Sequence, residues 1–159
     1  MHSTSAIIKA FVVLEGFSAA APAPWSVPPE HLEILALRRA TPLNPDSVTD
    51  VRCWNTEEKI IFHEENAAQL AICDGISGST SQCGGSPATT VGRKGSAKFT
   101  LTALRDGAKI NISKVRWEEC VHAARAVCPT GSLSATCRGG ATVGDVAFVL
   151  ENPALETKR

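Results

Sequence analysis

Apolar and polar residues alternate with a period of two over residues 98–113, as they do in strands with one buried face. The apolar positions of the two runs are Phe99, Leu101, Ala103, Ile110 and Ile112. Asp106-Gly107 lies between the runs, and this pair suits a tight turn because it tolerates positive φ. The pattern predicts a β-hairpin whose apolar side chains all lie on one face.

After Ser113 the period changes to that of an amphipathic helix. Its apolar stripe contains Trp117, Cys120, Val121, Ala124 and Val127 with Cys128, and Pro129 ends it. A second helix is predicted at residues 62–74, where Glu64 and Glu65 would favour the positive end of the helix dipole.

Two further strands are predicted at residues 48–54 and 145–152, and the Gly/Ser/Thr-rich segments 75–95 and 130–140 are predicted to be loops. The resulting order is β-α-β-β-α-β. Because each strand has one apolar face and each helix one apolar stripe, we expect an α+β fold with two helices packed on one face of an antiparallel sheet.

The N-terminal quarter has the features of a processing signal rather than of a domain. Residues 1–20 combine an apolar run with the small residues Ser18, Ala19 and Ala20, which favours a secretory signal peptide over a tail that is retained. Residues 21–39 are rich in proline, then weakly helical, and end in Arg38-Arg39. This pair indicates either a processing site at the end of a short pro-segment or an ordinary arginine pair at a helix end. The secreted domain would then comprise residues 40–159.

Six cysteines follow this segment: Cys53, Cys73, Cys83, Cys120, Cys128 and Cys137. An even number after a signal peptide predicts a disulfide framework that stabilises the domain. A zinc site would require closely spaced pairs such as C-x-x-C, which these spacings do not provide.

The pairing of these cysteines stays open at the level of sequence, with two schemes in view. Antiparallel helices would favour Cys73–Cys120, with Cys53–Cys128 at the other end and Cys83–Cys137 between the loops. The alternative pairs neighbours in sequence, as Cys73–Cys83, Cys128–Cys137 and Cys53–Cys120.

Basic and acidic residues are balanced at 16 each, and from Ala40 onward at 13 each. Without a basic stripe, nucleic acid is not an expected partner. No segment approaches the roughly 20 apolar residues of a membrane span, so no transmembrane segment is expected. We also expect a monomer that carries no metal and no cofactor.

Catalysis has little support in the residue pattern. After residue 39 the histidines are His63 and His122, and each is better explained as a structural or surface residue than as a general base. Residues 75–79 lack the last glycine of G-x-S-x-G. The triplet Asn111-Ile112-Ser113 is an N-glycosylation acceptor, and an unmodified exposed asparagine is the alternative.

These observations favour a binding protein over an enzyme. Candidate contact surfaces are the loops at residues 77–95 and 130–144, because loops held by disulfides on a rigid scaffold commonly carry binding residues. Arg93, Lys94 and Arg138 would be their charged members. A small secreted hydrolase and a protease inhibitor remain as alternatives.

The signal peptide, short pro-segment, six cysteines and element order together resemble small secreted cysteine-rich fungal proteins. Residues 62–150 resemble the layout of the killer-toxin-like α/β sandwich proteins, and residues 112–153 are similar to the necrosis-inducing secreted proteins. Both resemblances imply an extracellular protein that acts by binding or by membrane perturbation. The expectation is an effector or toxin that binds a host extracellular or membrane protein, with a role in virulence, necrosis induction or immune suppression.

Overall fold

A computed structural model describes residues 29–40, 42–76 and 82–154 of the chain. The predicted signal peptide, residues 21–28 of the predicted pro-segment and residues 77–81 of a predicted loop lie outside the described residues. The helices are α1 (Pro29–Ala40), α2 (Phe62–Leu70) and α3 (Lys114–Val127), with 3₁₀ turns η1 (Pro45–Ser47) and η2 (Ile72–Asp74). The strands are β1 (Val48–Asn55), β2 (Thr89–Lys94), β3 (Ala97–Ala103), β4 (Ser132–Cys137) and β5 (Val146–Glu151).

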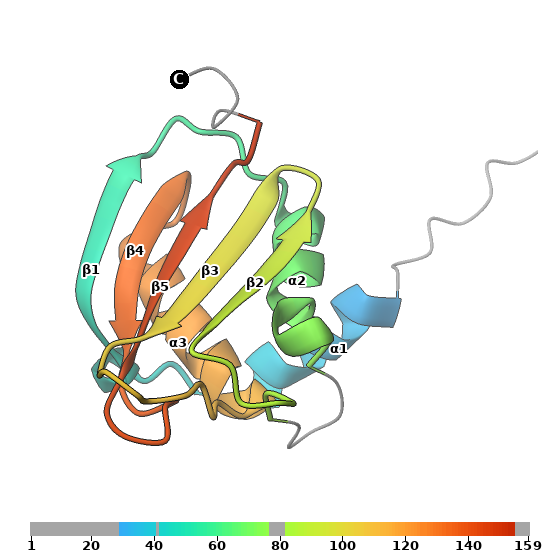
Figure 1. The fold of residues 1–159 in the computed structure, drawn as a ribbon. Helices are drawn as coiled ribbons and strands as arrows, with labels where there is room; N and C mark the ends of the chain where they lie inside the picture. The colour runs from blue at the N-terminus through green and yellow to red at the C-terminus, as the bar shows by residue number, and fades with distance from the viewer. Residues whose placement is uncertain (1–28, 41, 77–81, 155–159) are drawn as a thin grey trace, which may run out of the picture.

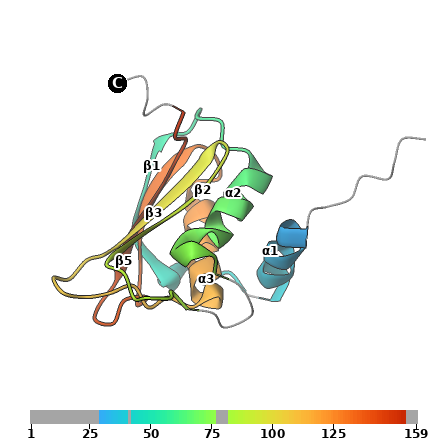
Figure 2. The same ribbon diagram turned by 45° about the vertical axis from the view of Figure 1, so that its right-hand side comes forward.

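The strands form one antiparallel sheet in the order β1-β4-β5-β3-β2 (Figure 1). Both α2 and α3 pack on the same face of this sheet, and α1 lies outside them as a further layer (Figure 2). The predicted α+β class, with two helices on one face of a disulfide-stabilised antiparallel sheet, is therefore confirmed.

One half of the predicted hairpin is wrong. The turn forms where expected, since Gly107 has φ +74° and Ala108 N–H donates to the Arg105 carbonyl over 3.0 Å. Residues 109–113, however, do not pair with β3, because β2 and β5 occupy both of its edges. The hairpin partner of β3 is β2, across a two-residue turn that begins at Gly95.

The two segments that were predicted to be loops contain strands. Segment 75–95 includes β2, and segment 130–140 includes β4, so the sheet has five strands where the sequence predicted four. Ile110 and Ile112 are fully buried as the alternation predicted, but they reach the core from a loop. Their burial therefore came from apolar character and not from strand pairing.

The core between the sheet and the helices is centred on Trp117 of α3, which is 1% exposed. Its ring meets the rings of Phe99 (β3) and Phe148 (β5) edge-on, with centroids 5.2 and 5.0 Å apart. Its Nε1–H donates to the Gln69 carbonyl of α2 over 3.0 Å. One side chain thus joins both helices to two central strands.

All six cysteines are paired, as Cys53–Cys128, Cys73–Cys83 and Cys120–Cys137. The first pair confirms a member of the favoured scheme, and the second belongs to the alternative. The third is in neither scheme. The other predicted pairs are wrong: Cys73–Cys120, Cys83–Cys137, Cys128–Cys137 and Cys53–Cys120.

The error at Cys73 has a local cause. The helices are antiparallel as expected, since Glu65 early in α2 binds Arg125 late in α3. Yet α2 ends at Leu70, before Cys73, which lies in η2 with φ +58°. Its N–H donates to Thr90 Oγ1 over 2.7 Å, which ties this cysteine to β2 rather than to α3.

The close packing of β2 on α2 depends on Gly92. A Cβ at this position would overlap the Ala68 carbonyl oxygen and lie 2.7 Å from the Ile72 backbone nitrogen. Gly92→Ala is expected to lower the free energy of unfolding by about 3 kcal/mol, because helix backbone cannot move aside as a side chain could. Urea unfolding followed by circular dichroism would measure this.

Gly84→Ala is the matched control for Gly92→Ala. A Cβ at Gly84 would meet no heavy atom within 4 Å. We expect this variant to unfold within about 0.5 kcal/mol of the wild type. Equal losses in the two variants would contradict the proposed cause.

Candidate functional site: a platform of three braced loops

Three loops meet at one end of the sheet, where β3 and β4 end and β5 begins. The register pairs Ala103 and Cys137, the last residues of β3 and β4, with Val146 at the start of β5. The loops adjoining this end comprise residues 82–88, 104–113 and 138–145, and we call them the loop platform. They lie at the bottom of Figure 1.

Main-chain hydrogen bonds join the three loops to one another. The bonds are Ile110 N–H to Pro87 O (2.7 Å), Asn111 N–H to Gly140 O (2.7 Å), Thr142 N–H to Lys109 O (2.8 Å) and Leu104 N–H to Asp145 O (3.1 Å). These bonds, which include an isolated antiparallel bridge between Ile110 and Ala141, hold the loops in one arrangement. The loop platform is therefore part of the folded framework.

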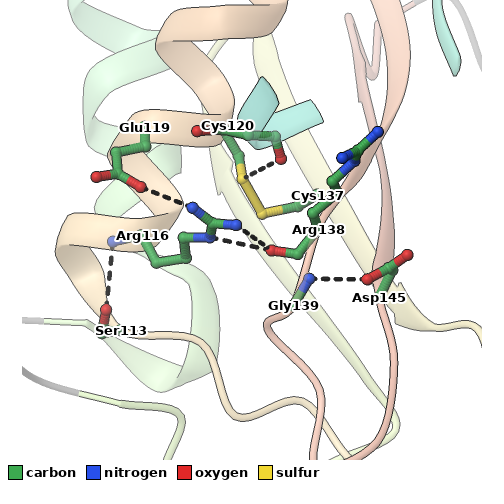
Figure 3. The surroundings of a disulfide bond; sticks show 9 residues. Ser113, Arg116, Glu119, Cys120, Cys137, Arg138, Gly139 and Asp145 are labelled. Carbon is green, nitrogen blue, oxygen red and sulfur yellow. Dashed lines mark hydrogen bonds and ion pairs between the residues drawn. A yellow bond between two sulfur atoms is a disulfide. The ribbon is translucent and has the colours of Figure 1, made fainter. Parts of the chain in front are cut away.

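The third loop is also anchored where it leaves β4 (Figure 3). Cys137 is bonded to Cys120 of α3 in the core, and the next carbonyl, that of Arg138, accepts hydrogen bonds from Arg116 Nε (3.0 Å) and Nη2 (2.5 Å). Gly139 N–H donates to Asp145 Oδ1 over 2.8 Å. The Arg138 side chain itself is exposed.

The loop platform presents apolar and cationic side chains to solvent. Leu104 and Val143 are 55% and 54% exposed. Arg105, Lys109 and Arg138 are exposed on the same loops and outnumber the one exposed carboxylate there, that of Asp106. Exposed apolar side chains grouped on braced loops, with charges around them, are typical of protein-binding surfaces.

Of the exposed apolar and cationic residues of the loop platform, only Arg138 was singled out from sequence as a binding residue. The Asp106-Gly107 turn was a signal for the segment that carries Leu104, Arg105 and Lys109. That segment was assigned to a hairpin, however, so its side chains were not recognised as a surface. Val143 gave no signal apart from lying in a predicted loop.

Arg93 and Lys94 lie at the opposite end of the sheet from Arg138. Lys94 ends β2 and pairs with Ala97 at the start of β3, whereas the loop platform follows the end of β3. The structure therefore does not bring the three predicted binding residues together. Any partner of Arg93 and Lys94 would engage a different surface.

The turn beside Lys94 is tied to the first turn of α2. Glu64 Oε2 accepts hydrogen bonds from Ser96 Oγ (2.5 Å) and Ser96 N–H (2.7 Å), while Ile61 N–H donates to Ser96 Oγ over 2.9 Å. These two bonds from Ser96 lower the pKa of the Glu64 carboxyl, and their effect exceeds the opposing effect of partial desolvation. The hydroxyl of Ser96 is thus engaged on both sides in a structural tie.

Asn111 of the predicted glycosylation triplet is exposed, but it belongs to the loop platform and not to a strand. Its N–H is bonded to Gly140 O, and the Ser113 hydroxyl caps α3 by accepting from Arg116 N–H over 3.2 Å. A glycan on Asn111 would stand on the loop platform and compete with any partner there.

A pocket of about 610 Å³ lies at the end of the sheet opposite the loop platform, between residues 56–62 and 129–131. The charged residues lining it are Glu57, Glu58, Lys59 and the ion pair of Arg125 with Glu65, which is bonded at 2.9 and 2.7 Å. Arg125 Nη1 also donates to the carbonyls of Cys128 and Gly131. These hydrogen bonds occupy the Arg125 guanidinium, which thereby joins α2, α3 and the residue that precedes β4.

Within residues 29–40, 42–76 and 82–154, histidine, cysteine and acidic side chains form no cluster of three or more that could hold a metal ion. None of the helices there has the length and apolar character needed to cross a membrane.

Comparisons with protein-family models, with curated proteins and with solved structures each found no match to this chain. The geometry of its own residues therefore carries the functional argument.

Proposed function

We propose that this chain is a secreted, monomeric effector or toxin-like protein that acts by binding a host extracellular or membrane protein through its loop platform. The observation that carries the proposal is the composition of that surface. Two exposed apolar residues, Leu104 and Val143, lie on braced loops that also present Arg105, Lys109 and Arg138.

The bracing of the loops favours binding because it reduces the entropy lost on association. Hydrogen bonds between the loops and the Cys120–Cys137 bridge order them before a partner arrives. The apolar pair would supply the buried centre of an interface and the cations its rim. The partner surface would then combine an apolar patch with acidic residues.

Secretion is supported by the disulfides, because such bonds persist mainly in oxidising compartments. The signal-like residues 1–20 favour the same destination, and the resemblance to cysteine-rich fungal effectors agrees with it. Binding rather than turnover is favoured because Arg125 at the pocket and Ser96 at the hairpin turn are committed to structural contacts. Roles in necrosis induction or immune suppression would follow from the identity of the bound protein.

The proposal predicts that binding depends on one end of the sheet. The oxidised full chain, immobilised, is expected to retain a protein from host extracellular and membrane fractions. Lys109→Glu with Arg138→Glu should weaken this binding about tenfold or more, because reversing rim charges opposes an acidic partner. Val143→Asp should weaken it similarly. Surface plasmon resonance with the purified partner would measure both effects.

Arg93→Glu is the matched control, since it reverses an exposed cation at the opposite end of the sheet. It should bind as the wild type does. Equal binding by all variants would overturn the assignment to the loop platform, as would loss of binding in Arg93→Glu alone. Release of cleaved fragments of the retained protein would instead establish a hydrolase.

A further inference from the structure

Helix α1 falls within the segment that the sequence marks as a pro-segment, yet it is packed onto the domain. It contacts α2 and α3 on the side of these helices that faces away from the sheet (Figure 2). The predicted pro-segment thus covers part of the helical layer. The residues of α2 and α3 that α1 covers therefore indicate which kind of ligand these two helices can bind.

The contact includes an ion pair between Glu33 of α1 and Lys114, the first residue of α3. The Lys114 side chain is 2% exposed, and lysine is rarely buried so completely without a partner. Burial lowers the pKa of Lys114, while the nearby Glu118 carboxylate raises it. A cation at a helix N-terminus also opposes the helix dipole. A second carboxylate beside Lys114 therefore stabilises the charged form of this lysine, and Glu33 of α1 supplies it.

Helix α1 would bind the domain only weakly if it were not covalently attached. A helix of 12 residues is marginally stable alone in water. Leu32 on α1 is 55% exposed, so part of the apolar surface of this helix is not used against the domain. The covalent connection through residue 41 keeps α1 at a high effective concentration, and cutting that connection would remove this advantage.

The candidate processing pair lies in the last turn of α1, since the helix extends to Ala40. Arg39 is exposed. Proteases bind their substrates in extended form, so cleavage after Arg39 requires this last turn to unwind. Unwinding from the end nearest the domain would loosen the helix that carries Glu33.

We propose that α1 is a built-in substitute for a partner helix. Cleavage after Arg39 releases α1, and the uncovered face of α2 and α3 around Lys114 then binds a helix of the host protein that places a carboxylate where Glu33 lies. The proposal rests on the secretion stated in the proposed function, and it adds cleavage at the Arg38-Arg39 pair. It adds a second contact surface to the loop platform and makes that surface available only after processing.

The first test measures the reactivity of the Lys114 amine. The oxidised full chain is cleaved with a dibasic-specific protease, treated with an amine-reactive reagent and analysed by mass spectrometry, with exposed Lys59 as internal reference. Relative to Lys59, Lys114 should react about tenfold faster after cleavage, because removal of α1 opens it to solvent. The uncleavable variant Arg38→Ala with Arg39→Ala should keep Lys114 protected. Equal labelling before and after cleavage, or a cleaved helix that stays bound, would overturn the proposal.

The second test measures binding of a synthetic peptide of residues 29–39 to the cleaved chain, from which the released helix has been removed. The peptide should bind, and its Glu33→Gln form should bind about tenfold more weakly because the carboxylate contact to Lys114 is lost. Identical affinities would refute the carboxylate requirement. Peptide binding without capture of any host protein by the cleaved chain would refute the host helix as the occupant. Capture of a host protein that the loop-platform variants bind as the wild type does would instead contradict the proposed function alone.

Discussion

Trp117→Ala is expected to lower the free energy of unfolding by about 5 kcal/mol, one of the two largest losses we predict for a change in this chain. Truncation of a buried tryptophan costs about 3–5 kcal/mol through lost apolar burial and the cavity left behind. Two edge-on aromatic contacts, to Phe99 and Phe148, add about 0.5–1.5 kcal/mol each. Small domains are stable by only about 5–15 kcal/mol, so the variant should be largely unfolded at moderate denaturant.

Two further variants separate the causes of this loss. Trp117→Phe keeps an aromatic ring but removes the Nε1–H that donates to the Gln69 carbonyl, and it should cost about 1–3 kcal/mol. Trp54→Ala changes a side chain that is 62% exposed and should cost less than about 0.5 kcal/mol. Urea unfolding followed by far-ultraviolet circular dichroism reports all three without relying on tryptophan emission. A loss in Trp54→Ala as large as that in Trp117→Ala would contradict the assignment of the core.

Trp117 also shows which parts of the fold can be predicted from sequence. Its place on the buried stripe of α3 follows from local periodicity, and so do the positions of β1, β3 and β5. Strand pairing is not local. The alternation at Ile110 and Ile112 correctly indicated burial, but whether these residues join β3 depends on which other strands compete for its edges.

Physical features of β2 and β4 explain why these two strands were not predicted from the sequence. In β2 the core-facing position opposite Phe99 is Gly92, which makes room for α2, so the strand lacks a full apolar alternation. In β4 the alternation of Leu133, Ala135 and Cys137 is present, but the surrounding glycine and serine residues favoured a loop. The loop platform could not be assembled from sequence, because its hydrogen bonds join segments that are brought together only by the sheet.

The Cys53–Cys128 bridge is expected to contribute more to stability than the Cys73–Cys83 bridge, although Cys53 is exposed. The first bridge joins residues 75 apart and the second joins residues only 10 apart. A cross-link stabilises mainly by restricting the unfolded chain, and the restriction grows with the length of the closed loop. Replacing both cysteines of each pair by alanine should therefore cost about 4.5 kcal/mol for the long loop and about 2.7 kcal/mol for the short one.

Loss of buried contacts alone would predict a larger loss of stability for the Cys73–Cys83 bridge. The comparison therefore distinguishes contact loss from chain entropy. Cys73 and Cys83 are 9% and 7% exposed, so their replacement removes buried contacts at both ends of the bridge, whereas Cys53 has little buried surface to lose. Chemical unfolding of the two double variants, with the other bridges oxidised, measures the order directly. A greater loss for the short loop would mean that contacts around the sulfur atoms, and not chain entropy, dominate. The predicted order would instead show that the bridge between β1 and the end of α3 acts chiefly on the unfolded chain.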